Sequence, residues 1–203
     1  GLAGENSELF FNSPIIGHDV LNGQGNDTDY DGESGDDIMV QGPGIQRSNG
    51  MFGFDWGIHK GDPVAANSDL GIPFFPAQTV FTLRDRFDSV EGLSGWTQND
   101  ILTGAAVLKG AAGGAGAGPG NPPDESDLKS QNVGLIDGFA EVLGYDTPEE
   151  LAALAALPFN TSVIDITLGA EVIIGGGGSD AIKGNLGNDI LDGGAGTDLA
   201  VFL

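Results

Sequence analysis

Residues 175–201 read GGGGSDAIK GNLGNDILD GGAGTDLAV, three consecutive repeats of nine residues. Each repeat opens with six residues that are rich in glycine and end in aspartate, and it closes with three residues that suit a short strand. Glycine accepts the positive φ angles of tight turns, where a Cβ is unfavourable. The repeats therefore predict a chain that alternates between tight turns and short strands.

Two further positions of the repeat fit this interpretation. The fourth position is glycine throughout, where the turn needs its conformational freedom: Gly178, Gly187 and Gly196. The eighth position is apolar at Ile182 and Leu191, and Ala200 is a weaker match. A side chain at the eighth position would point into a narrow core.

The aspartates of the three repeats are Asp180, Asp189 and Asp198. With two repeats per coil, residues 18 apart share an edge, so Asp180 and Asp198 become neighbours and Asp189 lies on the opposite edge. Facing carboxylates and turn carbonyls form an all-oxygen environment, which suits Ca²⁺ better than the strictly octahedral Mg²⁺. The alternative, a solvated Gly/Asp-rich linker, is disfavoured by three repeats in register.

The pattern GGxGxDxUx, with U a large apolar residue, resembles the RTX calcium-binding repeat family. The resemblance implies a mainly β chain folded as a parallel β-roll, the RTX solenoid, which binds several Ca²⁺ ions. It also implies a secreted bacterial protein that leaves the cell through a type I channel.

The same period recurs near the N-terminus in a degenerate form. Asp19, Asp37 and Asp55 are spaced by 18 residues and would share one edge. Asp27 lies one residue out of register, and Gln46 fills the next equivalent position, so the opposite edge is expected to bind poorly. The turn glycines and apolar eighth positions persist at Gly35, Gly44, Gly53, Leu21 and Met39, whereas Ser48 and Gly57 depart from the pattern.

Other segments interrupt the repeats. Pro63, Pro73 and Pro76 indicate a looped insertion, although TVFTL within it is strand-like. A later insertion opens with KGAAGGAGAGPGNPP, a flexible composition, and continues with helices near 133–143 and from Thr147. The expected organisation is 1–58 degenerate roll, 59–93 looped insertion, 94–104 a further rung containing Asp100, 105–170 Gly-rich linker with a two-helix insertion, and 171–203 regular roll.

The helix from Thr147 has the residues of a strong start, with Pro148 in the first turn and Glu150 completing a capping box. Leu151, Leu154 and Leu157 share one of its faces. We expect that face to cover the core of the roll or to pack on the first helix rather than to bind a ligand.

Composition agrees with a calcium-dependent module. The chain has 30 Asp and Glu against 7 Lys and Arg, a formal net charge of −23, 36 glycines and no cysteine. Without cations, charge repulsion and glycine entropy should exceed the stabilisation by a thin core, so we expect folding to be coupled to calcium. The charge makes nucleic acid an unfavourable partner, and no apolar run is long enough for membrane insertion.

No sequence motif for catalysis is present: HExxH, GxSxG and the Walker loop are all missing. His18 and His59 lie in turn-like contexts, and we assign no catalysis to either. The stretch GDDIMVQGPGIQRSNGMFGFDWGIHKGD, with LRDRFDSVEGLSGW and NDILTG, resembles the RTX-bearing region of large bacterial proteins that carry an animal-type haem peroxidase domain. This resemblance suggests a parent protein and does not make the chain a peroxidase.

The leading hypothesis is a non-catalytic calcium-binding module, part of a larger secreted polypeptide, that folds on Ca²⁺ outside the cell or at its surface. One alternative is a calcium-dependent adhesion or self-assembly module, as in a filament or surface layer. Another is a non-catalytic part of a secreted haem peroxidase. The predicted metal ligands are Asp19, Asp27, Asp37, Asp55, Asp100, Asp180, Asp189 and Asp198.

Overall fold

The structure is a computed structural model that describes residues 2–3, 18–23, 25, 27–33, 35–51, 53–72, 84–105, 128–135, 139–159, 161–164 and 171–202. Short strands dominate this part of the chain, and their pairing is parallel except between two strands of the helical insertion. The predicted mainly β class with parallel strands is therefore confirmed.

The strands form two stacks, and the first is a single six-stranded sheet. In spatial order it contains β16 (Ile190–Asp192), β13 (Val172–Ile174), β9 (Gly92–Ser94), β6 (Trp56–Ile58), β4 (Ile38–Val40) and β2 (Val20–Asn22).

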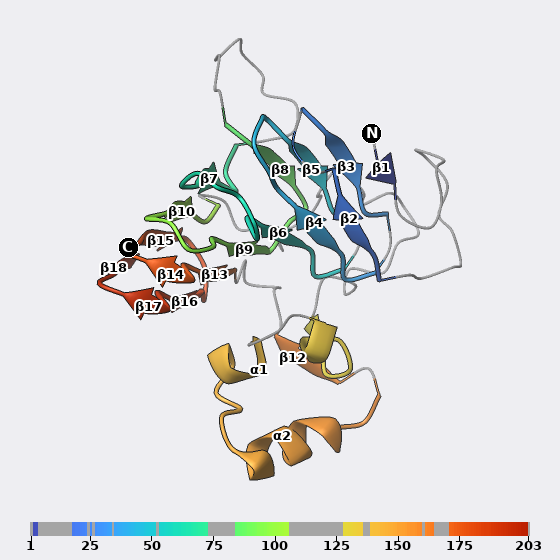
Figure 1. Ribbon diagram of the computed structural model, residues 1–203. Coiled ribbons are helices and arrows are strands. Elements are labelled where there is room, and N and C mark those ends of the chain that lie inside the picture. Colours follow the sequence, from blue (N-terminus) through green and yellow to red (C-terminus); the bar gives the residue numbers. More distant parts are fainter. Residues whose placement is uncertain are drawn as a thin grey trace.

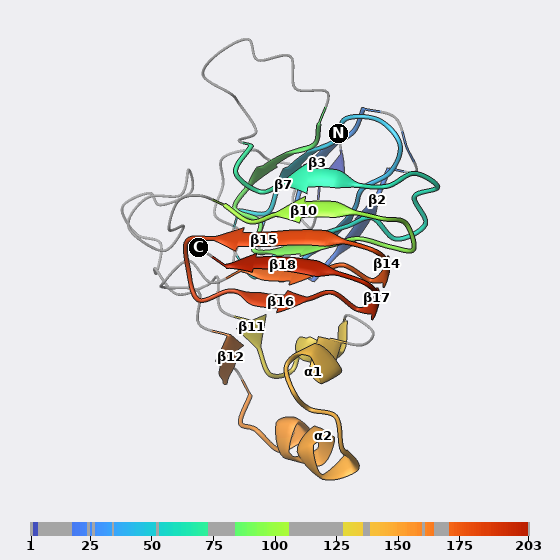
Figure 2. The same cartoon turned by 90° about the vertical axis from the view of Figure 1, so that its left-hand side faces the viewer.

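The second stack consists of two four-stranded sheets, which lie end to end (Figures 1 and 2). The N-terminal sheet contains β1 (Leu2–Ala3), β3 (Asp29–Asp31), β5 (Arg47–Asn49) and β8 (Arg86–Asp88). The C-terminal sheet contains β7 (Asn67–Asp69), β10 (Ile101–Thr103), β15 (Ala181–Asn185) and β18 (Leu199–Phe202).

The chain visits the two stacks in turn, so that neighbouring strands of one stack are 18 residues apart. Val20 pairs with Ile38, and Ile38 pairs with Trp56, in the six-stranded sheet. The middle residue of each three-residue strand faces the space between the stacks, as at Leu21 and Met39. The predicted inward position of the apolar eighth residue is confirmed for these two and for Ile182, which is 1% exposed.

The period changes between β6 and β9, which pair although they are 36 residues apart. Here the chain runs ahead to β7, which pairs with β10, and then returns to β8, which pairs with β5. The segment expected to be a looped insertion over 59–93 thus contributes two strands to the second stack. The strand-like TVFTL stretch, residues 79–83, lies outside the described residues.

The second interruption does not separate the two repeat blocks. β9 pairs with β13 and β10 pairs with β15, and the matching residues, such as Asp100 and Asp180, are 80 positions apart. The strands on either side of the insertion therefore stack as if they were consecutive. The Gly/Ala/Pro tract at its start lies outside the described residues.

The remaining elements are short. β14 (Gly177–Gly178) and β17 (Ala195–Gly196) pair within stacked turns, and β11 (Leu128–Lys129) pairs with β12 (Ser162–Ile164) in the insertion. Between the last two lie a 3₁₀ turn (Val133–Leu135), α1 (Phe139–Val142) and α2 (Pro148–Ala155). The predicted capping box of α2 is confirmed, because the Thr147 side chain accepts from Glu150 N–H and Glu150 accepts from Thr147 N–H.

The insertion lies on one side of the strands (Figure 1) and packs on the outer face of the six-stranded sheet. Leu128, Val133 and Leu154 join a buried cluster with Trp56 and Val172 of the sheet. A polar contact adds to this packing, because buried Asn132 donates a hydrogen bond from Nδ2 to Oδ2 of Asp36 in the N-terminal turns. The expected packing role of α2 is confirmed for Leu154 and for half-buried Leu157, whereas Leu151 is 39% exposed.

The substitution Leu154→Ala should lower the free energy of unfolding by about 2–4 kcal/mol, because it leaves a cavity between α2 and the sheet. Leu151→Ala is the matched control on the same helix and should cost less than about 1 kcal/mol. Urea denaturation followed by the fluorescence of buried Trp56, in a Trp96→Phe background, measures both. Equal costs for the two leucines would contradict the docking of α2.

Candidate metal sites at the two edges

A carboxylate stands immediately before most strands. We name the turns that lead into the six-stranded sheet the first edge and those that lead into the four-stranded sheets the second edge. The first-edge acids are Asp19, Asp37, Asp55, Glu91, Glu171 and Asp189. The second-edge acids are Asp85, Asp100, Asp180 and Asp198.

On the first edge, Asp37, Asp55, Glu91 and Asp189 each accept a hydrogen bond from the backbone of the previous acid in the column, whereas Glu171 Oε1 accepts from Ala105 N at 2.9 Å. Asp19 N donates to Asp37 Oδ1 at 2.7 Å, and Asp37 N donates to Asp55 Oδ1 at 2.9 Å. Asp55 N donates to Glu91 Oε2 at 3.0 Å, which carries the column across the 36-residue step. These side chains tie each turn to the next one.

The second edge repeats this arrangement across the helical insertion. Asp100 N donates to Asp180 Oδ1 at 2.7 Å, and Asp180 N donates to Asp198 Oδ1 at 3.0 Å. Asp100 accepts in turn from Ala66 N at 2.7 Å. The structure thus places Asp100 on the edge of Asp180 and Asp198, and Asp189 on the opposite edge.

The other carboxylate oxygen faces the first glycine of the same repeat. A Cβ at Gly175 would lie 2.4 Å from Asp180 Oδ2 and 2.6 Å from the carbonyl oxygen of Gly193. The same holds at Gly95, where a Cβ would lie 2.2 Å from Asp100 Oδ2. Glycine is required there by the close approach of these oxygens, whereas the fourth glycine, such as Gly178 with φ 132°, is required by its backbone angle.

Several of these second oxygens are buried without any hydrogen-bond donor, namely Oδ2 of Asp19, Asp55 and Asp180. A buried anionic oxygen without a partner is costly. Burial raises the pKa of Asp55 well above its ordinary value, and the nearby carboxylates of Glu91 and Asp37 raise it further. Burial likewise raises the pKa of Asp180 and of Asp189.

A hard cation would satisfy such oxygens. Within the described residues, no group of three or more His, Cys, Asp or Glu side chains could hold a metal ion by itself. A calcium site at these edges would therefore combine carboxylates with turn carbonyls, which is ordinary calcium coordination. The donor set fits Ca²⁺ and offers no nitrogen or sulfur ligand of the kind that transition metals prefer.

Two residues of the N-terminal turns, Asp27 and Gln46, depart from the pattern of one acid before each strand. Asp27 is exposed and its Oδ1 accepts from Ile45 N at 2.9 Å. It lies two positions before the start of β3, one position earlier than the acids of the columns, so it joins neither column. Gln46 occupies the second edge as a neutral residue, and its N–H donates to Asp85 Oδ1 at 2.9 Å.

Sequence reasoning missed Glu91, Glu171 and Asp85. Glu91 and Glu171 do carry a signal, because each is followed by a three-residue strand and then glycine, at Gly95 and Gly175. The same acid–strand–glycine spacing joins Asp180 to Gly184. A search for aspartate alone does not detect this spacing at Glu91 and Glu171.

The histidines lie away from these columns or at their margin. His59 is buried, with Nε2 2.8 Å from Ser68 Oγ and Nδ1 3.7 Å from Asp62 Oδ2, and burial lowers its pKa. His18 is exposed, and its Nδ1 accepts from Asp36 N at 2.8 Å.

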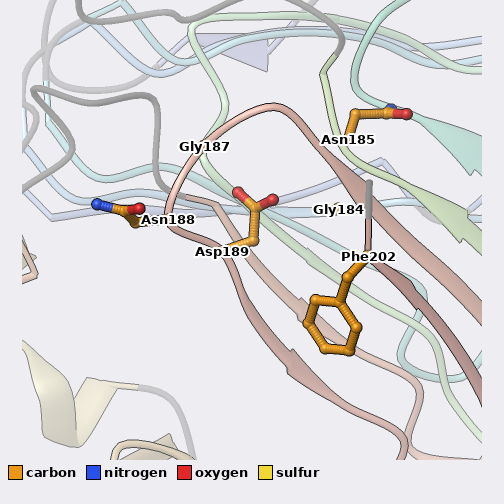
Figure 3. A pocket seen from close by; sticks show the side chains of 6 residues that line it. All are labelled: Gly184, Asn185, Gly187, Asn188, Asp189 and Phe202. Carbon is orange, nitrogen blue, oxygen red and sulfur yellow. The ribbon is translucent and has the colours of Figure 1, made fainter.

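The last first-edge turn opens onto a cavity of about 310 Å³ (Figure 3). Asp189 and Asn188 of that turn and Phe202 of β18 contribute to its walls. The carboxylate of Asp189 has one oxygen engaged, because Oδ1 accepts from Glu171 N at 3.1 Å.

The stacked turns with an acid in the sixth position agree with a comparison of the sequence with protein-family models. Residues 165–200 match the RTX calcium-binding nonapeptide repeat (4 copies). The C-terminal segment carries RTX repeats. The match starts before the three repeats found by pattern and includes Glu171.

The family match supports calcium binding and does not extend to a haem peroxidase association. No curated protein and no solved structure matches the chain. In the described part of the chain, no helix has the length and apolar character needed to cross a membrane.

The contact between the first glycine and the carboxylate predicts a strong effect of one methyl group. Gly175→Ala should lower the free energy of unfolding by about 1–3 kcal/mol, because the Cβ displaces the Asp180 carboxylate and the neighbouring turn. Gly134→Ala is the control, since nothing lies within 4 Å of its Cβ position. Thermal denaturation in excess calcium compares them, and equal midpoints would refute the close approach.

The raised carboxyl pKa values predict how the metal-free chain responds to pH. A raised folded-state pKa means that the folded chain holds its protons more tightly than the unfolded chain. The resulting stabilisation is complete below the ordinary carboxyl pKa of about 3.9 and is lost as pH rises through the raised values. The metal-free chain should therefore be more ordered near pH 4 than at pH 7 by far-UV circular dichroism.

Asp55→Asn should flatten this pH dependence, because it removes the most strongly perturbed charge. Exposed Asp146→Asn is the control and should follow the unsubstituted chain. A metal-free chain that gains structure as the pH rises from 4 to 7 would show that the buried carboxylates are not the groups that limit folding.

Proposed function

We propose that this chain is a calcium-binding module that folds as an RTX-type parallel β-roll, with Ca²⁺ ions held by the turns of both edges. The observation that carries the proposal is the pair of carboxylate columns, one along each edge. In several of these carboxylates, the second oxygen is buried and has no hydrogen-bond donor among the described residues. The RTX match over residues 165–200 supports the same chemistry.

The proposal extends to the N-terminal block, which lies outside the matched residues. Asp37 and Asp55 accept a hydrogen bond from the previous turn through Oδ1, as Asp180 and Asp198 do, and for Asp37, Asp55 and Asp198 the donor lies 18 residues earlier. A Cβ at Gly50 would lie 2.1 Å from Asp55 Oδ2, so the first glycine is equally constrained. We therefore place several ions along the first edge, with Glu91 serving where aspartate is replaced.

Calcium then acts as a folding switch. The formal net charge is −23, and the columns concentrate part of that charge in buried positions. Cation binding offsets the repulsion, so the binding energy becomes folding energy. Extracellular calcium modules bind at about 10⁻⁴ to 10⁻³ M, which would leave the module unfolded in a cytosol and folded outside.

On this basis the chain is a non-catalytic part of a larger secreted polypeptide, with a structural or secretion-assisting role. His59 is buried, with 3% of its surface exposed, and its Nε2 lies 2.8 Å from Ser68 Oγ. Export by a type I channel and membership of a haem peroxidase parent follow only from the resemblances seen in the sequence.

The test is a calcium titration of the metal-free chain by far-UV circular dichroism, with Mg²⁺ as control. A cooperative gain of β signal that is specific to Ca²⁺ is expected. Asp180→Asn should shift the midpoint to higher calcium, whereas exposed Asp146→Asn should not. A metal-free chain that is already fully folded at pH 7 would refute the proposal.

A second candidate function is calcium-dependent self-assembly. It is favoured by exposed apolar side chains on the edge strand β18, where Leu199 is 62% and Phe202 is 73% exposed. Light scattering of the calcium-loaded chain decides between the two: multimers that disappear in Leu199→Ser favour assembly, and a monomer at high concentration favours a purely structural module.

A further inference from the structure

The few cationic residues of this acidic chain are not spread evenly. All three arginines, Arg47, Arg84 and Arg86, lie on or beside the second stack. Arg47 and Arg86 project from the outer face of the N-terminal four-stranded sheet, because Ser48 and Phe87 between the outward positions face the core. The Arg47 and Asp29 part of this face is open to solvent, with the two side chains 38% and 43% exposed.

Two of the arginines have acidic partners. Arg47 forms a two-point contact with Asp29, through Nε to Oδ1 at 2.5 Å and Nη2 to Oδ2 at 2.8 Å. Arg84 lies with Nη1 3.6 Å from Asp69 Oδ2, and its Nε donates to the carbonyl oxygen of Asn67 at 2.8 Å. Both guanidinium groups are therefore neutralised from within the chain.

Arg86 differs from both. Its guanidinium makes no hydrogen bond or ion pair with any residue in the described part of the chain, and its Nε is buried. Residues 73–83, which lead towards it in sequence, contain no Asp or Glu. An arginine without an acid is unexpected in a chain where acids outnumber bases by 30 to 7.

The register of the strands places Arg86 directly beside another arginine. Asp29 pairs with Arg47, and Arg47 pairs with Arg86, so the outer face carries the column acid–base–base. Like charges directly opposite each other destabilise a sheet, and a buried donor without an acceptor adds a further cost. An oxyanion beside the Nη groups of Arg86 would offset the like-charge contact, and the paired donors of a guanidinium match a carboxylate in particular.

The residues next to Arg86 on this face indicate which other groups the ligand would carry. Asp31, Asn49 and Asp88 stand in register on the same face, two residues further along their strands. Asn49 Nδ2 lies 3.4 Å from Asp31 Oδ1, and the remaining carboxylate oxygens are acceptors for hydroxyl groups. The net charge of −23 disfavours a densely charged polyanion and leaves a ligand with one carboxylate among hydroxyls.

We propose that Arg86, with Arg47 beside it and the Asp31–Asn49–Asp88 column adjacent, forms a binding site for a single uronic acid, free or as the one charged residue of an otherwise neutral glycan. Arg86 binds the carboxylate through its two Nη groups, and the adjacent column accepts hydrogen bonds from the sugar hydroxyls. The site does not include the carboxylates of the two edges and is independent of the proposed calcium sites.

The chain has only three arginines, so ¹⁵N NMR resolves three side-chain Nε–Hε signals, which arginine-to-lysine variants assign. We would titrate the calcium-loaded chain with sodium glucuronate, and in parallel with glucose and with sodium sulfate at equal ionic strength. The expected result is a saturable shift of the Arg86 signal by glucuronate, with a dissociation constant on the order of 1 mM. The Arg84 signal should not move.

Arg86→Lys should weaken glucuronate binding about tenfold, because a lysine lacks the paired donors, and Arg84→Lys is the matched control that should bind normally. Circular dichroism in calcium verifies that both variants fold. No shift of Arg86, an equal shift with glucose, or unchanged affinity in Arg86→Lys would each overturn the site. A sulfate shift of equal affinity would reduce it to an adventitious ion only.

Discussion

The structure depends on one repeated contact, in which the carboxylate of each turn reaches the backbone of the neighbouring turn. One oxygen accepts a backbone hydrogen bond, as Asp180 does from Asp100, and the other lies against the first glycine of its own repeat. This arrangement holds each turn against its neighbour, whether they are 18, 36 or 80 residues apart, and places negative charge in a column. Under the proposed function, the turns stack only where protons or cations compensate that charge.

Because the contact is local to each pair of turns, the stack tolerates interruptions of different kinds. Between β6 and β9 the chain gains a detour in which β7 and β8 enter the second stack out of sequence order. Between β10 and β13 it gains a helical insertion, whose apolar residues cover the outer face of the six-stranded sheet around Trp56. In both cases the acid ladder resumes after the interruption, through Glu91 and through Asp180.

Much of the site could be predicted from sequence, because its spacing is built into the chain. The positions of Asp180, Asp189 and Asp198 on alternate edges follow from a nine-residue period, and Asp19, Asp37 and Asp55 follow from the same count. Glu91 and Glu171 were missed because a longer acid occupies the same position, and Asp27 joins neither column because it stands one residue early. The helix from Thr147 was predictable from its capping residues, since such signals act within one turn.

The sequence by itself determined the turns, the short strands, the parallel class and the acidic chemistry, because each depends on residues within nine or 18 positions. Only the tertiary structure decided that the two repeat blocks stack together and that Asp100 shares an edge with Asp180. It also decided that β7 pairs with β10 while β8, later in the sequence, pairs with β5. It further decided which face the insertion covers and that Arg86 has no acidic partner among the residues that the structure describes. These features depend on contacts between residues 36, 80 or more positions apart, whose pairing no local period encodes.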